Sequence, residues 1–212
     1  MTQTFHSLGR RAALLLLGSF VSTVCYAATI QADLGLGPLY AVQEGVAFHT
    51  GITLGRAVML VGVGLVVLAV VLRQWPGPGT VALPFIGGAT LDALLPHMPA
   101  VNGLALRLVV VVVASWTMAL GGALMIRASI GVAALDAVML GIHERVPWTI
   151  RQVRLAMEGT MLVIGFVLGG SIGVGTVITG LLIGPGLHYW LGVLSSTNDD
   201  QVATHSFQTA GG

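Results

Sequence analysis

The side chains of this sequence best suited to chemistry are a few ionisable groups inside long apolar stretches. Arg154 and Glu158 stand four positions apart in the apolar stretch 152–169. On a helix this spacing puts both side chains on one face, where they form an ion pair, and pairing reduces the cost of taking each charge out of water. We expect the pair to act either as a gate or solute contact, or as a structural lock between its helix and the neighbouring helices.

Asp136 is a lone acid in the short apolar segment AALDAVMLG, residues 133–141. Removing a carboxylate from water without a partner is costly, so its presence in such a segment needs a reason. Two interpretations are equally open: the carboxylate lines a solute cavity, or it caps a local turn.

Asp92 and His188 each follow a point where a helix would be weakened. Gly87-Gly88 precedes Asp92, and Gly184-Pro185 precedes His188. Interrupted membrane helices expose carbonyl groups and helix ends that can bind ions or polar solutes. Breaks at these two places predict a solute site near Asp92 and His188.

Thr80 and Thr176 begin the same two apolar stretches and are further candidates for solute contact. In the alternative interpretation both threonines cap their helices and Asp92 lies near the membrane interface. His188 would then lie in an aromatic belt with Tyr189 and Trp190.

Motifs for catalysis or cofactor binding are weak in this sequence. The segment GGSIG, residues 169–173, has the form Gly-x-Ser-x-Gly, but that motif needs a strand-to-helix turn with a paired His and acid. His143 and Glu144 are adjacent, so on a helix they point in different directions, and the His-Glu-x-x-His pattern of zinc proteases is absent. We therefore predict no enzyme, no catalytic residue, no metal site and no cofactor.

The composition places these residues in lipid. Of the 212 residues, 55% are hydrophobic and only 8% are charged, whereas a soluble domain carries roughly 25% charged residues. The sequence has no basic run interleaved with aromatic residues, which argues against a nucleic-acid partner. Its one cysteine, Cys25, lies in an apolar run and is expected to be a small buried side chain.

The helices that must position these side chains are encoded twice. The junction Gly77-x-Gly79-Thr80 recurs 96 positions later as Gly173-x-Gly175-Thr176. The stretch 11–30 matches 107–126 at the same offset. Because the second copy lies in mid-chain, we interpret the first as a membrane span rather than a cleaved signal peptide. The sequence therefore predicts two repeats of about 96 residues.

Each repeat contains three stretches long enough to cross a bilayer, which needs about 20 apolar residues. The predicted spans are 11–31, 54–73 and 79–95 in the first repeat and 107–127, 152–169 and 175–194 in the second. The shorter segments 36–49 and 132–146 are predicted to be interfacial or re-entrant helices, which membranes tolerate where the backbone is buried in protein or faces water. The fold class is thus an all-α polytopic membrane protein.

Three spans per repeat would give the repeats opposite orientations, and the arginines agree with both termini lying in the cytoplasm. Only Arg56 and Arg107 would then lie outside. The cytoplasmic arginines would be Arg10, Arg11, Arg73, Arg127, Arg145, Arg151 and Arg154. If the short segments crossed as well, there would be eight spans and the repeats would be parallel.

These elements divide the chain into four parts. They are an N-terminal cytoplasmic end, a first membrane repeat, a second membrane repeat and a disordered cytoplasmic tail, at residues 1–9, 10–98, 99–194 and 195–212.

The second half resembles the bacterial YczE-like integral membrane proteins, which are similar to the broader YitT-type group. The resemblance rests on VRLAMEG at 153–159 and GSIGVGTVITGLLIGP at 170–185. It departs from the family pattern at Ala133-Ala134, where the family has Gly-Pro before an aspartate. The resemblance covers about residues 10–192 and implies a multi-pass protein of the bacterial inner membrane, without indicating a substrate.

We therefore expect a small secondary transporter or channel-like carrier of an unidentified small solute across the bacterial inner membrane. The alternative is a non-transporting membrane scaffold or regulatory protein for a partner complex. The expected partners are the lipid bilayer, a small-molecule or ion substrate and a second copy of the chain.

Overall fold

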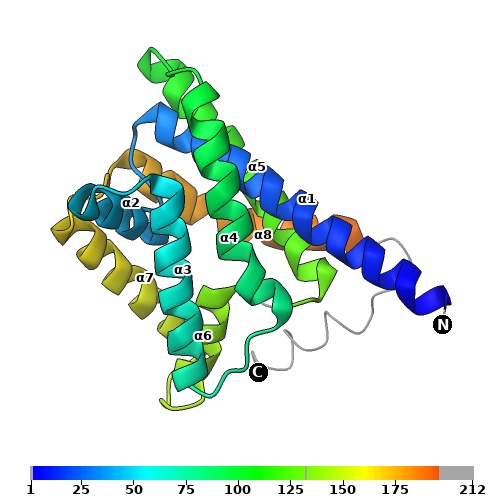
Figure 1. The fold of residues 1–212 in the computed structure, drawn as a ribbon. Coiled ribbons are helices and arrows are strands. Elements are labelled where there is room, and N and C mark those ends of the chain that lie inside the picture. Colours follow the sequence, from blue (N-terminus) through cyan, green and yellow to red (C-terminus); the bar gives the residue numbers. More distant parts are fainter. Residues whose placement is uncertain (1, 132, 196–212) are drawn as a thin grey trace.

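The computed structural model describes residues 2–131 and 133–195 and is helical throughout these ranges, without a strand. The long apolar runs of the sequence leave backbone groups that lipid cannot hydrogen-bond, and a helix satisfies them internally. The elements are α1 Thr2–Ala32, α2 Pro38–Thr50, α3 Leu54–Val71, α4 Pro78–Leu94, η1 Leu95–His97, α5 Leu104–Ala128, α6 Ala134–His143, α7 Ile150–Val167 and α8 Val174–Ser195 (Figure 1). The all-α prediction is confirmed. Apart from Ser195, the tail predicted to be disordered lies outside the described residues.

Five of the described helices are long and apolar enough to cross a bilayer. They are α1 from Leu8 onward, α3, α4 together with η1, α5 and α8. The predicted span at 152–169 is not among them, because α7, although as long as α3, is less apolar and carries Arg151, Arg154 and Glu158. The prediction of three spans per half therefore holds for the first half, whereas only two helices of the second half qualify.

Antiparallel packing of α1 and α5 forms the centre of the molecule. Gly18 of α1 lies against the backbone of Gly121 in α5, so closely that a methyl group at either position would collide with the other helix. Asp33, at the other end of α1, lies beside Arg107 near the start of α5. Small residues allow this close backbone contact. In lipid, where no hydrophobic effect drives helices together, such van der Waals packing holds them in contact.

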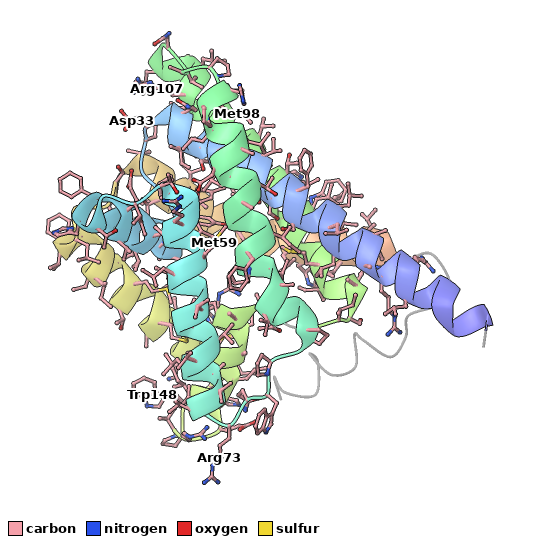
Figure 2. All side chains as sticks on the ribbon, viewed as in Figure 1. Asp33, Met59, Arg73, Met98, Arg107 and Trp148 are labelled. Atoms are coloured by element: carbon pink, nitrogen blue, oxygen red, sulfur yellow. The ribbon has the colours of Figure 1, made fainter. Side chains whose placement is uncertain are left out.

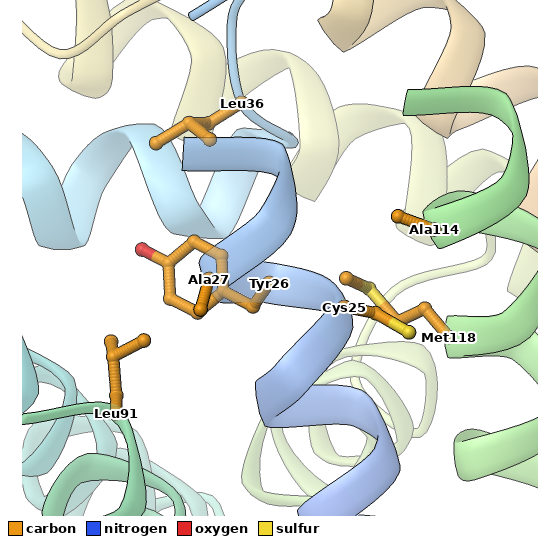
Figure 3. Close-up of a cluster of buried hydrophobic side chains, with 7 residues drawn as sticks. All are labelled: Cys25, Tyr26, Ala27, Leu36, Leu91, Ala114 and Met118. Atoms are coloured by element: carbon orange, nitrogen blue, oxygen red, sulfur yellow. The ribbon is translucent and has the colours of Figure 1, made fainter. Parts of the chain in front are cut away.

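Beside this contact, apolar side chains of four segments converge on Tyr26 and Met118 (Figure 3). Cys25 is buried here, as expected. The ring of Tyr26 stacks on that of Tyr40 from α2, with centroids 3.9 Å apart. The buried members of the group are Cys25, Tyr26, Ala27, Leu36, Leu91, Ala114 and Met118.

The other helices surround this centre in an unequal way. α4 packs on α1 and α3, while α8 packs on α5; the short helices α2 and α6 pack on α7 and α3. A hydrogen bond of 3.1 Å between the hydroxyls of Ser115 and Thr179 joins α5 to α8. The tight packing of α3 on α4 thus has no equally extensive counterpart between α7 and α8.

The helix breaks predicted at Gly87-Gly88 and Gly184-Pro185 are not present. α4 runs continuously from Pro78 to Leu94 and α8 from Val174 to Ser195, with Pro185 inside it. Gly88 instead lies against the carbonyl of Gly55 in α3, so this glycine serves close helix packing. A proline removes one backbone hydrogen bond, which membrane helices tolerate.

The molecule has two ends that differ in charge. In Figure 2, Asp33, Met98 and Arg107 lie at one end, while Arg73 and Trp148 lie at the other. We call them the Asp33 end and the Arg73 end. At the Arg73 end the loop after α3 meets the loop after α6, where Gln74 donates a hydrogen bond of 2.7 Å to Glu144.

Candidate functional site

Three of the charged residues singled out in the sequence line one cavity between α6 and α7. Asp136 comes from α6, and Arg154 and Glu158 come from α7. The cavity has a volume of about 40 Å³. Its remaining lining is apolar and consists of Leu135, Met139, Met157 and Met161.

The start of α7 sets the positions of its charged side chains. Thr149 caps the helix by accepting a hydrogen bond from the backbone N–H of Gln152, and the Gln152 side chain accepts from the backbone N–H of Thr149. This reciprocal cap fixes the first turn of a helix. Arg154 and Glu158, one turn apart, then share a face with the methionines at 157 and 161.

α6 is held by apolar contacts on the side away from the cavity. Ala137 and Val138 are buried against Ala69 of α3. Gly141 lies against Leu72, where an added methyl group would collide. Successive side chains of a helix point in different directions, so burial of 137 and 138 against α3 leaves Asp136 on the side that faces α7.

The cavity contains one ion pair and one further carboxylate. Arg154 Nε donates a hydrogen bond of 3.0 Å to Glu158 Oε1, and both side chains stay partly exposed, at 49% and 38%. The side chain of Asp136 makes no hydrogen bond within the described part of the chain. Burial raises the pKa of the Asp136 carboxyl above its ordinary value, and the nearby Arg154 offsets part of this rise. The arrangement therefore holds an ion pair beside a carboxyl group that makes no hydrogen bond within the described residues.

The positions 96 residues earlier carry no charge and are filled by packing. Tyr40, the counterpart of Asp136, stacks on Tyr26. Val58, the counterpart of Arg154, packs on the central apolar group. Gly62, the counterpart of Glu158, lies against Pro84. The charged cavity therefore belongs to the second half alone.

Asp92, in contrast, has a structural role at the start of α3. Its Oδ1 accepts a hydrogen bond of 2.8 Å from the backbone N–H of Gly55, and its Oδ2 accepts one of 2.6 Å from the hydroxyl of Thr53. These groups stand at the start of α3, where backbone N–H groups lack partners within the helix. Asp92 thus caps α3 from the end of α4 and lies outside the α6–α7 cavity.

His188 and the two candidate threonines also lie outside the cavity. His188 is exposed on α8, next to Tyr189, whose ring contacts Trp190 and Trp116. The buried hydroxyl of Thr176 donates a hydrogen bond of 2.7 Å to the carbonyl of Leu36 and accepts one of 3.1 Å from the N–H of Gly173.

The glycine-threonine junctions connect helix starts to distant loops. Gly35, with φ of +99°, lies against the backbone of Gly173, a conformation and a distance that only glycine permits. Thr80 is fully buried beside Gly131, and the N–H of Gly79 donates a hydrogen bond of 3.2 Å to Ile130. Thr80 and Thr176 are therefore buried at inter-helix junctions.

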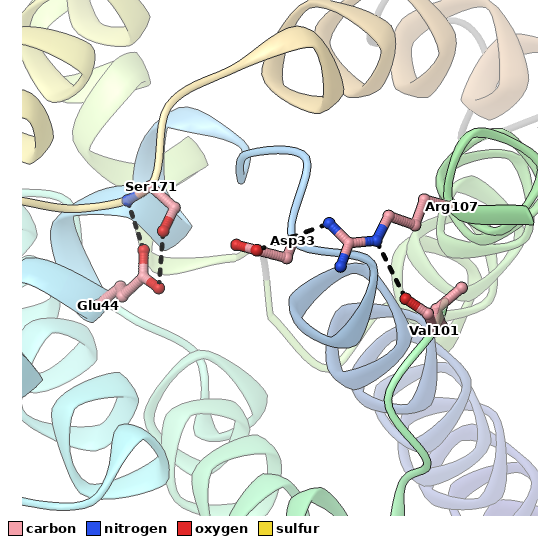
Figure 4. Close-up of polar contacts among 5 residues, drawn as sticks. All are labelled: Asp33, Glu44, Val101, Arg107 and Ser171. Atoms are coloured by element: carbon pink, nitrogen blue, oxygen red, sulfur yellow. Dashed lines mark hydrogen bonds and ion pairs between the residues drawn. The ribbon is translucent and has the colours of Figure 1, made fainter. Parts of the chain in front are cut away.

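A second polar region, at the Asp33 end, was not identified from the sequence (Figure 4). Glu44 accepts hydrogen bonds from the backbone N–H and the hydroxyl of Ser171, the latter at 3.0 Å. Arg107 lies 3.7 Å from Asp33 and donates to the carbonyl of Val101 at 3.0 Å. The cavity beside Glu44 and Asp33 has about 10 Å³, room for about one water molecule. These contacts join segments far apart in sequence, which no local pattern predicts.

Within the described ranges, no three His, Cys, Asp or Glu side chains gather closely enough to hold a metal ion.

Comparison with known proteins relates the chain to membrane proteins without an assigned activity. Residues 9–191 match the family of unknown function DUF6198. The uncharacterized membrane protein YczE of Bacillus subtilis is 28% identical over 152 residues, 71% of each chain. An uncharacterized protein of Haemophilus influenzae is 25% identical over 170 residues, 78% of this chain and 76% of the relative. The uncharacterized protein YyaS of Bacillus subtilis is 26% identical over 182 residues, 84% of this chain and 90% of the relative. No solved structure matches.

Proposed function

We propose that this chain, which belongs to the family of unknown function DUF6198 and resembles the membrane protein YczE, carries a small solute across the bacterial inner membrane. The resemblance to the YczE-like proteins seen in the sequence is confirmed, and the protein is a membrane-embedded helical protein. The proposal is a carrier rather than an enzyme, with Asp136, Arg154 and Glu158 as its solute contacts.

The charged cavity between α6 and α7 is the observation that supports a carrier. An ionisable side chain in a membrane segment costs at least about 2.5 kcal/mol at the centre and is usually functional. Here three such side chains gather at one cavity, although 8% of the residues are charged. A purely structural ion pair would account for Arg154 and Glu158, but it would leave Asp136 without a role.

The arrangement of the helices favours two inverted repeats, which is the architecture of many carriers. The starts of α2 and α6, of α3 and α7, and of α4 and α8 are each 96 residues apart. α1 and α5 cross in antiparallel directions, and the contact of α1 with α4 corresponds to that of α5 with α8. In our proposal the halves rock about the α1–α5 contact to expose the cavity alternately on either side.

The charge of the two ends supports an orientation with the Arg73 end in the cytoplasm. Of the nine arginines, only Arg56 and Arg107 belong to the Asp33 end. Arginine is enriched on the cytoplasmic side of bacterial membrane proteins. In our proposal α7 also crosses, in addition to the five qualifying helices, so both chain termini are cytoplasmic and the loop 97–103 is outside.

Solute binding and uptake by the reconstituted protein test the proposal. A screen of small solutes should identify at least one that raises the unfolding temperature and is taken up by proteoliposomes. Asp136→Asn and Glu158→Gln should abolish both effects, whereas Glu144→Gln, at an acid of the Arg73 end away from the cavity, should preserve them. Uptake that persists in both cavity variants would contradict the assigned site, and a screen without any bound or transported solute would contradict the carrier itself.

The alternative of a scaffold is favoured by the open space beside α8. Among the described residues, no atom lies within 4 Å of a methyl group placed on Gly180 or Gly184, whereas their counterparts in α4, Pro84 and Gly88, are covered by α3. A partner helix, including one from a second copy, could occupy this face. A copurifying partner or a stable dimer in a protein that binds no solute would support this alternative.

A further inference from the structure

We propose that the cavity between α6 and α7 binds a small organic cation, a protonated amine on a short apolar body. This inference rests on the proposed carrier function and names the class of its solute. It is carried by the charge balance of the cavity, by its lining and by the unpartnered carboxylate of Asp136.

The charges of the cavity leave one negative charge without a partner. Arg154 and Glu158 neutralise each other across their hydrogen bond of 3.0 Å. The side chain of Asp136, the second carboxylate of the lining, makes no hydrogen bond within the described residues and lies near the already paired Arg154. An ionised carboxylate away from water is costly unless it is paired, and a charge-assisted hydrogen bond from an ammonium group is a strong way to pair it.

The remaining lining suits an apolar body. Leu135, Met139, Met157 and Met161 contribute no charge and surround the acids. Methionine is flexible and polarisable, so it fills irregular spaces and adapts to different ligands. A volume of about 40 Å³ admits only a few non-hydrogen atoms before the methionines move, which restricts the ligand to a small molecule.

The same lining disfavours the other simple classes of ligand. Hard metal ions such as Ca²⁺ take six to eight oxygen ligands, and here one of the two carboxylates already binds Arg154. An anion would meet two acids and a guanidinium that is already paired. A neutral solute would leave Asp136 without a counter-charge.

Four probes test the inference on the purified full-length protein in detergent. Butylammonium chloride, sodium butyrate and 1-butanol are similar in size, and sodium chloride matches the salts in ionic strength. Binding is measured by calorimetry and by the shift in unfolding temperature. We expect butylammonium alone to bind and stabilise the wild-type protein. Asp136→Asn should weaken this binding at least tenfold, whereas Asp136→Glu, which keeps the charge, and Glu144→Gln, outside the cavity, should retain it.

Asp136→Glu also shows whether a loss of binding reflects charge or folding, because it changes the side chain at the same position. Equal stabilisation by butyrate or butanol would overturn the cation class and leave the carrier proposal standing. Equal stabilisation by sodium chloride would assign the effect to an inorganic cation or to screening, and would also overturn the inference. If no probe binds, the inference fails, while the carrier proposal fails only if the broader solute screen and the uptake assay also find nothing.

Discussion

Two aspartates of this chain are candidate solute contacts in the sequence, and their surroundings separate them. Asp92 accepts two hydrogen bonds at the start of α3, so its charge is satisfied by the fold. Asp136 has none within the described residues and faces a cavity beside Arg154. The difference depends on which helix end or helix face lies opposite, and a single sequence does not contain that information.

The environment of Asp136 predicts a pH-dependent cost to stability. In the folded protein, burial raises the pKa of the Asp136 carboxyl above its ordinary value of 3.8. The folded state therefore holds this proton more tightly than the unfolded state. Stability is therefore lost as the pH rises from about 4 through the raised value. Asp136→Asn does not titrate, so its unfolding temperature relative to wild type should increase between about pH 4 and pH 7. Tryptophan fluorescence during heating measures this, and a difference independent of pH would contradict it.

Because Asp92 caps α3 and lies outside the α6–α7 cavity, we expect its replacement to lower stability rather than to change binding in the cavity. Asp92→Ala leaves the Gly55 N–H and the Thr53 hydroxyl without their acceptor and should cost about 1–2 kcal/mol. His188→Ala, at an exposed position of α8, should change stability by less than about 0.5 kcal/mol. Chemical denaturation of both variants in detergent measures this, and an equal loss in the two would contradict the assigned cap.

At the scale of the helices, equivalent positions of the two halves carry different residue types and serve different purposes. Gly55 and Gly62 allow α3 to approach α4 closely. Their counterparts in α7 are Arg151 and Glu158, which are too large and polar for such packing. α7 therefore contacts α2 and α6 instead, and the space that results is the charged cavity.

Two glycines of α3 provide a matched test of this packing. A methyl group at Gly62 would collide with the ring of Pro84, whereas one at Gly64 meets no atom of the described residues within 4 Å. Gly62→Ala should therefore destabilise the protein by about 1–3 kcal/mol. Gly64→Ala should be neutral or slightly stabilising because alanine favours a helix. Thermal unfolding of the two variants side by side measures the difference, and equal behaviour would show that α3 and α4 are not in this contact.

For the whole molecule, the distribution of arginine predicts how it lies in the membrane. The chain's one cysteine, Cys25, is buried, so Cys25→Ala provides a background for single-cysteine labelling. Asn102→Cys, at the Asp33 end, should react with an impermeant maleimide added to intact cells. Trp75→Cys, an 86% exposed position at the Arg73 end, should react only after the membrane is opened. The reverse pattern would contradict the proposed orientation.

Several features were predictable from the sequence because they depend on local or periodic properties. The helical class and five of the membrane spans follow from runs of apolar residues. The start of α7 is also a local property, since Thr149 and Gln152 form a reciprocal cap, although we predicted this helix to begin at 152. The grouping of Arg154 with Glu158 follows from their spacing of one helical turn. The predicted breaks in α4 and α8 were wrong because glycine and proline weaken an isolated helix, whereas in this fold Gly88 supports close contact with α3.

The sequence by itself determined that this chain is a helical membrane protein with charged residues that need a partner, because hydrophobicity and helical spacing are properties of neighbouring residues. Only the tertiary structure decided which charges meet. It placed Asp136 beside Arg154 and Glu158, assigned Asp92 to a helix cap and joined Glu44 to Ser171. Such choices depend on how closely helices distant in sequence approach one another, and the bulk of the side chains at every contact sets those distances.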